Sequence, residues 1–424
     1  MTKEMAMLPN MGFKLTDTYF LLFCEKNSDG TKHLRLKGKD LYRRNGKRLT
    51  HMDMLAVSLF LRDHPEVVSI DLCYNDIGDV GVEIMTENYF NKKNTLLDLN
   101  LMSNDLTFIG LSKLYKVAHN LTLRTLRLNG NKFGKKGGEY AAKLIECIPS
   151  LELLELGDTD QILRSIDSIL EVAKKSKLKV LDISRVIPKT KYDVFNPSWM
   201  AKNAGLFLEV NKHLTELHME KCEMDGHDIQ IMLLGMVNNK SLKLLNIAAN
   251  KIGCLGLRMI AKWLETEPAL LGLDVSNNQI GDTGARAFSF GMCYSKLKFL
   301  NISYNRIGDD GMACILDTLK KPYYMRLFFF YGNPIGSKSL KIVERMILSG
   351  VLKQNYIDTK VYEVDGELQA AFYPTTHFKQ QYYSVMTYGC TVPLKIKQNK
   401  VEPQDLKRRP FYNLPYYERY QPFY

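Results

Sequence analysis

One spacing constrains this 424-residue chain more than any other feature: an asparagine after a short apolar stretch, recurring every 27 to 29 residues. The clearest copy is LKFLNISYNRIGDDGMACIL, residues 297–316, which gives the frame L-x-x-L-x-L-x-x-N ending at Asn305. Its alternating side chains predict a short strand, and Gly308 and Gly311 predict a tight turn into a helix. One such unit cannot bury its own apolar face, so the frame requires neighbouring copies.

Further copies are present in register. Degenerate copies fill the gaps between them, with Thr159 or Val186 at the asparagine position, and a weak copy at residues 34–41 begins the series. We count about eleven units, whose period predicts an α/β solenoid with parallel strands on the concave face and helices on the convex face. The side chain at the asparagine position is expected to bond backbone groups left unpaired where each strand ends. The positions of this structural ladder are Asn75, Asn104, Asn131, Cys222, Asn250, Asn278, Asn305 and Asn333.

With this frame and the I-G-D-x-G turn that begins at Ile307, residues 31–350 resemble the ribonuclease-inhibitor-like class of leucine-rich repeat proteins. The same turn is found in Ran GTPase-activating proteins and in NOD-type receptors. The resemblance implies a horseshoe-shaped solenoid.

The pattern also predicts how the chain is divided. A short helix over Leu15–Lys26, opened by Thr16 or Asp17, is expected to cover the first repeat. A helix over Ser337–Leu352 is expected to close the other end, and KVYEVDGEL (360–368) has the turn of a hairpin. The predicted parts are an N-terminal cap (1–30), the solenoid (31–336, with an insertion at about 186–204), a C-terminal cap (337–356) and an extended tail rich in aromatics and proline (357–424).

The densest charge run lies between Lys32 and Arg48, where eight basic residues accompany one acid, Asp40. Its two readings are a solvated turn and a docking surface for an acidic partner. The net charge of +12 also favours acidic partners, with nucleic acid as one possibility but without sequence specificity. The candidate partner-binding residues of this run are Lys32, Arg35, Arg43, Arg44, Lys47 and Arg48.

Aromatic residues supply the remaining candidates for partner binding. Tyr192 and Trp199 lie in the insertion, where either packing or recognition explains them. The tail is expected to be anchored to a partner, or back over the solenoid, through side-chain burial, because its prolines preclude a long helix. The anchoring residues proposed are Phe411, Tyr412, Tyr416, Tyr417, Tyr420 and Phe423.

No catalytic or cofactor site can be assembled from the sequence. GNKFGKK (130–136) has the wrong spacing for a phosphate loop. His213, His218, Cys222 and His227 diverge in the repeat frame, so zinc is not expected. Outward-facing strand positions carry acids such as Asp98 and bases such as Arg127, in alternation. We therefore expect a protein that is not an enzyme and has no cofactor or metal.

The leading functional hypothesis is a protein-interaction scaffold in a hetero-complex, such as a ciliary or flagellar axonemal assembly, because its tail composition is similar to that of axonemal proteins. The alternatives are a nuclear or nucleolar regulator linked to ribosome biogenesis or cell differentiation, and a GTPase regulator of the Ran-activating type. Ribonuclease inhibition fits poorly, since such inhibitors are acidic and rich in cysteine.

The sequence also predicts where the protein is located. Its eight cysteines are scattered without C-x-x-C, and no signal peptide is recognisable. We therefore expect an intracellular protein, in the cytoplasm and axoneme or in the nucleus, with no membrane contact.

Overall fold

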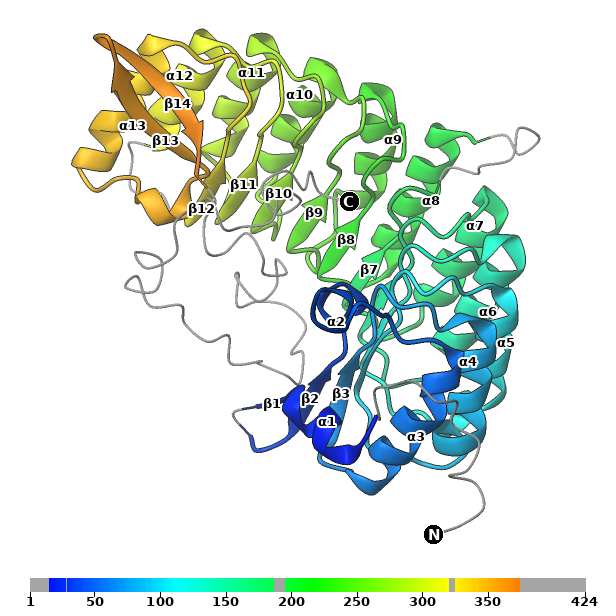
Figure 1. Ribbon diagram of the computed structural model, residues 1–424. Helices are drawn as coiled ribbons and strands as arrows, with labels where there is room; N and C mark the ends of the chain where they lie inside the picture. Colours follow the sequence, from blue (N-terminus) through cyan, green and yellow to red (C-terminus); the bar gives the residue numbers. More distant parts are fainter. Residues whose placement is uncertain (1–14, 28, 187–194, 320–324, 374–424) are drawn as a thin grey trace.

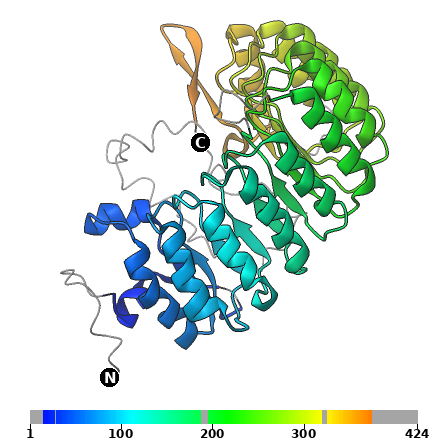
Figure 2. The same ribbon diagram turned by 90° about the vertical axis from the view of Figure 1, so that its right-hand side faces the viewer.

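The computed structural model describes residues 15–27, 29–186, 195–319 and 325–373. These residues form an arc in which a single curved sheet lines the inner side and the helices stand along the outer side (Figure 1). Turned by 90°, the arc shows its helices stacked side by side in chain order (Figure 2). The alternation of strand and helix is the leucine-rich repeat solenoid that the sequence predicts.

The sheet follows the order of the chain without a crossover. β1 (Cys24–Lys26) is antiparallel to β2 (Lys32–Arg35), whereas β2 to β12 are parallel, so the described residues hold eleven parallel strands, as the count of repeats predicts. The other strands are β3 (Val67–Asp71), β4 (Asp98–Asn100), β5 (Thr125–Arg127), β6 (Leu153–Glu155), β7 (Val180–Asp182), β8 (Glu216–His218), β9 (Leu244–Asn246), β10 (Gly272–Asp274), β11 (Phe299–Asn301) and β12 (Leu327–Phe329).

One helix or more follows each strand from β2 to β12. Among the described residues, no helix combines the length and apolarity needed to cross a bilayer. The helices are α1 (Asp17–Leu22), α2 (Gly38–Asn45), α3 (Met54–Asp63), α4 (Gly78–Met85), α5 (Phe108–Lys116), α6 (Gly134–Cys147), α7 (Leu163–Ala173), α8 (Pro197–Val210), α9 (Gly226–Met236), α10 (Gly253–Leu264), α11 (Asp282–Met292), α12 (Asp309–Leu319) and α13 (Ser337–Leu348), with 3₁₀ turns at His51–Asp53, Ala118–Asn120 and Gln354–Tyr356 and a π-helical turn at Thr86–Phe90.

The core lies between sheet and helices. The middle residue of each short strand points toward the helices; Leu273, Leu300 and Phe328, for example, lie opposite one another in register and belong to one continuous core cluster. Side chains alternate across a strand, so the residues on either side of each middle residue face the inner surface. The leucine frame therefore fixes which side chains are available for binding.

The ladder asparagines tie consecutive repeats together. Asn305 donates from Nδ2 to the carbonyls of Ile302 in its own repeat (2.9 Å) and Val275 in the preceding one (3.0 Å). Its Oδ1 accepts from the backbone N–H groups of Asn278 (2.8 Å) and Ile280 (3.1 Å). Each of the seven ladder asparagines donates to a carbonyl of the preceding repeat. The side chain thus replaces the partners that the bend of the strand removes.

The aspartate of the I-G-D-x-G turn makes a second link between repeats. Asp282 Oδ1 accepts from the N–H groups of Gly308 (2.7 Å) and Gly311 (3.1 Å) at the start of the next helix. A Cβ on Gly311 would lie 2.5 Å from this oxygen. The glycine is therefore needed for close approach, and the carboxylate caps a helix N-terminus across the repeat boundary.

At the N-terminal end the predicted helix is wrong beyond Leu22. α1 begins after Thr16, whose hydroxyl accepts from the N–H of Tyr19 (3.3 Å), and ends at Leu22. Residues Cys24–Lys26 instead form β1 and pair with β2. A solenoid exposes unpaired backbone groups at its first strand, and an antiparallel strand satisfies them better than a helix can.

The predicted insertion at about 186–204 is too long. Its second part belongs to α8, which starts at Pro197 behind an Asn196 N-cap that accepts from the N–H of Trp199 (3.0 Å). Proline fits the first helical turn because it has no N–H to satisfy there. Residues 187–194, which include Tyr192, lie outside the described residues.

At the C-terminal end, α13 stops at Leu348 instead of the predicted Leu352, because Gly350 takes a left-handed conformation (φ +76°). Ile357 then pairs with Phe328 as a further parallel bridge. The next residue, Asp358, accepts from the backbone N–H groups of Phe330 (2.8 Å) and Tyr331 (3.1 Å). A hairpin of β13 (Thr359–Val364) and β14 (Glu367–Phe372) follows, and its predicted Asp-Gly turn has positive φ at both residues.

Candidate functional site

Two rows of side chains run along the inner face from β3 to β12. They stay in register, so that Phe299 lies opposite Gly272 and Leu327, for example. The first row is Ser69, Asp98, Thr125, Leu153, Val180, Glu216, Leu244, Gly272, Phe299 and Leu327, and the second is Asp71, Asn100, Arg127, Glu155, Asp182, His218, Asn246, Asp274, Asn301 and Phe329.

The N-terminal half of this face is a chain of ion pairs. Arg127 contacts Asp98 (Nη1–Oδ1 3.1 Å) and Glu155 (Nε–Oε1 3.3 Å), and Ser69 donates to Asp98 (3.1 Å). Burial raises the pKa of Glu155, although Arg127 opposes this effect. Buried charges are tolerated only when they compensate one another. These groups are therefore already engaged within the protein.

The middle of the face carries an acidic centre, which we define as Asp182, Glu216, Glu220 and Asp274 around His218. The ring Nε2 of His218 lies 2.7 Å from Glu216 Oε1. Burial alone would lower the pKa of His218, but the hydrogen bond and charge of Glu216, together with Asp182 and Glu220, raise it to about 9. Burial and the neighbouring acids raise the pKa of Glu220 to about 7. Even with His218 protonated, negative charge exceeds positive charge within the centre.

The C-terminal part of the face is apolar. Leu244, Phe299, Leu327 and Phe329 form a cluster separate from the main core, with Leu271 and Tyr356 packed against it, and none of the four side chains is more than 5% exposed; we call these four residues the apolar patch. The rings of Phe299 and Phe329 meet edge to face, with centroids 5.6 Å apart.

Gly272 lies between Leu244 and Phe299 in the first row. A Cβ at this position would lie only 3.0 Å from Leu244 Cδ1 and 3.3 Å from Phe299 Cδ1. The absence of a side chain lets these two neighbours lean toward each other across the row.

The charge alternation expected along the whole inner face is therefore wrong for β9 to β12. Asp158 lies outside the two rows, beyond the end of β6 with φ +56°, and pairs with Arg185 (3.3 Å). The apolar patch could have been found from the sequence, because Phe299 and Leu327 occupy positions of the leucine frame that face outward.

The basic run of residues 32–48 is split by the fold. Lys32 pairs with Glu66 (3.0 Å) and Arg35 with Asp40 (2.9 Å), so both are neutralised within the chain. The other four candidates, which we call the basic segment, are exposed around the end of α2. Arg44 lies over the ring of Phe23, and Arg48 lies 3.7 Å from Asp76. The basic segment consists of Arg43, Arg44, Lys47 and Arg48.

The aromatic candidates are only partly described. Trp199 is half-buried in the first turn of α8. Tyr192 and the six tail residues Phe411, Tyr412, Tyr416, Tyr417, Tyr420 and Phe423 lie outside the described residues.

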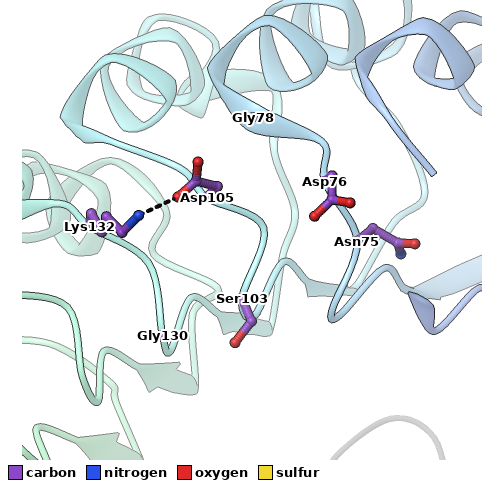
Figure 3. A pocket seen from close by; sticks show the side chains of 7 residues that line it. All are labelled: Asn75, Asp76, Gly78, Ser103, Asp105, Gly130 and Lys132. Carbon is purple, nitrogen blue, oxygen red and sulfur yellow. Dashed lines mark hydrogen bonds and ion pairs between the residues drawn. The ribbon is translucent and has the colours of Figure 1, made fainter. Parts of the chain in front are cut away.

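The phosphate-loop-like stretch at 130–136 uses its backbone N–H groups for repeat contacts. Gly130 donates to Gly157 O (2.9 Å), Lys132 to Leu106 O (2.9 Å) and Gly134 to Thr159 O (3.2 Å). A phosphate cradle needs such groups to be available. Part of this stretch lines an open pocket of about 510 Å³ with residues of the two preceding turns. There the side chain of Lys132 is paired with Asp105 at 2.8 Å (Figure 3).

The zinc-like spacing around Cys222 does not converge either. Cys222 is buried on the core side, where burial raises the pKa of its thiol to about 12, whereas His218 is on the inner face. Across the described part of the chain, no group of three or more His, Cys, Asp and Glu side chains could hold a metal ion.

Comparisons of the sequence with known protein sequences agree with this architecture. A family model described as Leucine Rich repeat matches residues 119–140, 270–289 and 295–316. Over 313 residues the chain is 24% identical to ribonuclease inhibitor from Sus scrofa, covering 73% of this chain and 66% of that protein. Among solved structures, a plant peptide hormone receptor, RGFR1 in complex with RGF2, matches 75% of this chain and 47% of that chain, with 13% identity and a TM-score of 0.33.

A stronger match decides the family. Over 350 residues the chain is 30% identical to leucine-rich repeat-containing protein 34 from Mus musculus, covering 82% of this chain and 83% of that protein. The region aligned is long enough to include most of the repeats. The chain therefore belongs to the leucine-rich repeat proteins, in the family of leucine-rich repeat-containing protein 34.

Proposed function

We propose that this protein is a non-enzymatic interaction scaffold that binds an extended protein segment along the inner face of its sheet. The partner's apolar or aromatic side chains would cover the apolar patch, and its basic side chains would lie beside the acidic centre. Repeat solenoids provide long concave surfaces for such partners.

The observation that carries this proposal is the position of the apolar patch. Phe299 and Phe329 lie on the face of the sheet opposite the core cluster that holds Leu300 and Phe328. Aromatic residues clustered at a concave surface, with charged groups around them, are the usual composition of a binding hot spot. The acidic centre beside the patch would then fix register and orientation.

The assembly we propose is a ciliary or flagellar axonemal complex. The support is compositional: residues 374–424 hold eleven Phe or Tyr residues and six prolines, which suits a segment ordered by large, permanent contacts. The test is extraction of axonemes, with detergent and then with high salt, from ciliated cells that express the tagged chain. The full chain should stay in the axonemal pellet. Release with detergent alone, or a purely nuclear signal, would contradict the axonemal role.

The basic segment favours a second candidate, a nuclear role through an acidic partner such as RNA or an acidic protein tail. Reversing Arg43, Arg44, Lys47 and Arg48 to Glu should change the melting temperature little, because exposed ion pairs such as Arg48–Asp76 contribute about 0–1 kcal/mol. Association should weaken. Phosphate contacts release counterions, so RNA binding, measured by fluorescence anisotropy, should fall steeply with salt. If the fourfold variant keeps every partner of the wild type, the basic segment is only solvated surface.

A further inference from the structure

We propose that residues 374–424 of this chain occupy the C-terminal half of its own inner face, with aromatic side chains on the apolar patch and basic side chains beside the acidic centre. The inference rests on the proposed function, because it makes the tail a competitor for the same surface. The aromatic side chains that contact an assembly when a partner is present would cover the chain's own inner face when it is absent.

An occupant of the apolar patch is expected to carry aromatic rings or large aliphatic side chains. Phe299 and Phe329 form an edge-to-face pair, and Leu244 and Phe299 close over Gly272 between them. Further aromatic rings pack favourably against such a group in offset or edge-to-face arrangements. The tail offers Phe411, Tyr412 and further rings within 14 residues of its end.

Charge complementarity points to the same segment. Residues 374–424 carry eight Lys or Arg residues against three Asp or Glu residues. Lys407, Arg408 and Arg409 directly precede the aromatic cluster, so basic and aromatic groups alternate along the tail. The inner face likewise has charged and apolar regions side by side, since the acidic centre, around β7, β8 and β10, adjoins the apolar patch on β9, β11 and β12.

The place where the described chain ends makes the contact easy to reach. The N–H of Tyr373 donates to Asp358 O (2.8 Å) beside the last strand, and the ring of Phe372 lies 5.3 Å from that of Tyr331. The tail therefore starts at the C-terminal end of the inner face. From β12 to β7 there are five strand spacings, roughly 24 Å in total. The 51 residues from 374 to 424 can span roughly 170 Å when extended, so the tail can cross the face with ample slack.

Tethering favours this occupant over a free one of equal chemistry. Attachment to the same chain raises the effective concentration of a segment, although less for a long connection than for a short one. A partner must therefore bind more tightly than the tail, or carry the tail elsewhere, before it reaches the apolar patch. The tail would thus set a minimum affinity for partners of the inner face.

Photocrosslinking in the purified full-length protein tests this. Phe299 is replaced by p-benzoylphenylalanine, which keeps an aromatic ring at the site, and the cross-linked peptides are mapped by mass spectrometry. The matched control carries the same replacement at Phe290, which is 68% exposed on α11. We expect intramolecular cross-links from position 299 into 374–424, at least fivefold more abundant than from position 290. Lys407→Glu, Arg408→Glu and Arg409→Glu together should reduce their yield several-fold.

Each other outcome overturns the proposal in a recognisable way. Covalent dimers from position 299 would mean that a second copy covers the apolar patch. Equal yields from positions 299 and 290 would mean random collisions of the tail. If position 299 cross-links to another protein in a cell extract but never to 374–424, the proposed function stands and self-occupancy is wrong. If it cross-links to neither, both are wrong.

Discussion

At the scale of single residues, the solenoid depends on side chains that stand in for backbone partners. Asn305 makes five such bonds, three of them from Nδ2 and two to Oδ1. The need for an amide at this position was predictable from the sequence, because only an amide both donates and accepts in the required way. The cross-repeat bonds of Asp282 were not predicted, since they depend on how closely one turn approaches the next.

The first prediction is that Asn305→Ala lowers the free energy of unfolding by about 1–3 kcal/mol, because it strands buried backbone N–H and carbonyl groups. Urea unfolding followed by circular dichroism measures the effect. Asn238→Ala is the control, since Asn238 is exposed. If the two variants lose the same free energy of unfolding, the ladder asparagines do not stabilise the solenoid as predicted.

The second prediction concerns Asp358 at the end of the sheet. Burial raises the pKa of this carboxyl to about 6, although the N–H groups of Phe330 and Tyr331 oppose the shift. The ordinary value is about 4, so the folded state holds this proton more tightly than the unfolded state. The resulting stability is fully present below about pH 4 and is lost as pH rises through about 6.

Asp358→Asn keeps the side chain neutral at every pH, so it isolates this effect. The stability of the wild type relative to the variant should fall by on the order of 1–3 kcal/mol between about pH 4 and pH 7.5. Urea unfolding of both proteins across this range measures the difference, and groups common to both cancel. A difference that is constant with pH, or that grows with pH, would show that the carboxyl is not destabilised by burial.

At the scale of elements, the ladder is weakest in the middle of the arc. The side chain of Thr159 donates to the carbonyl of Leu156 in its own repeat (2.6 Å), and the side chain of Val186 has no polar group. The thiol of Cys222 reaches Ile183 O at 3.7 Å, a weak contact. The strong amide bonds that join consecutive repeats elsewhere are therefore missing after β6, β7 and β8.

We predict that local opening begins in residues 150–210. Hydrogen–deuterium exchange of the native protein should show β6, β7 and α7 exchanging faster than the corresponding elements β10, β11 and α11, which lie between complete asparagine positions. The prediction is wrong if residues 150–210 are the best-protected part of the solenoid.

The boundaries of helices and strands were predictable where a local sequence signal determines them. They were not predictable where contact with a neighbouring strand determines them. The hairpin turn at Asp365 and Gly366 was found because Asp-Gly favours positive φ at both residues. Strand β1 was missed because CEK, residues 24–26, has no strand pattern of its own. It is extended only because β2 offers an unpaired edge.

At the scale of the whole molecule, one period determines the curvature, the sheet order and the core. The inner face is less predictable, because the frame fixes which positions point inward but not how their side chains combine along eleven parallel strands. The ion pairs of Arg127 and the acidic centre around His218 join residues from different repeats, at least 28 residues apart in the first case. The result is a face that is polar and self-paired at one end and apolar at the other.

The most direct test of the central claim, that the inner face is the binding surface, compares two phenylalanines. Phe299 is fully buried whereas Phe290 is 68% exposed, so Phe299→Ala is also expected to lower stability. Tagged full-length Phe299→Ala and Phe290→Ala are therefore compared at a temperature at which circular dichroism shows both to be folded, and their captured proteins are quantified against the wild type. We predict that Phe299→Ala changes the capture of specific partners at least tenfold, which corresponds to about 1.4 kcal/mol, while Phe290→Ala leaves it within twofold. Loss of partners with Phe290→Ala and none with Phe299→Ala would place the binding surface on the helices and contradict the account.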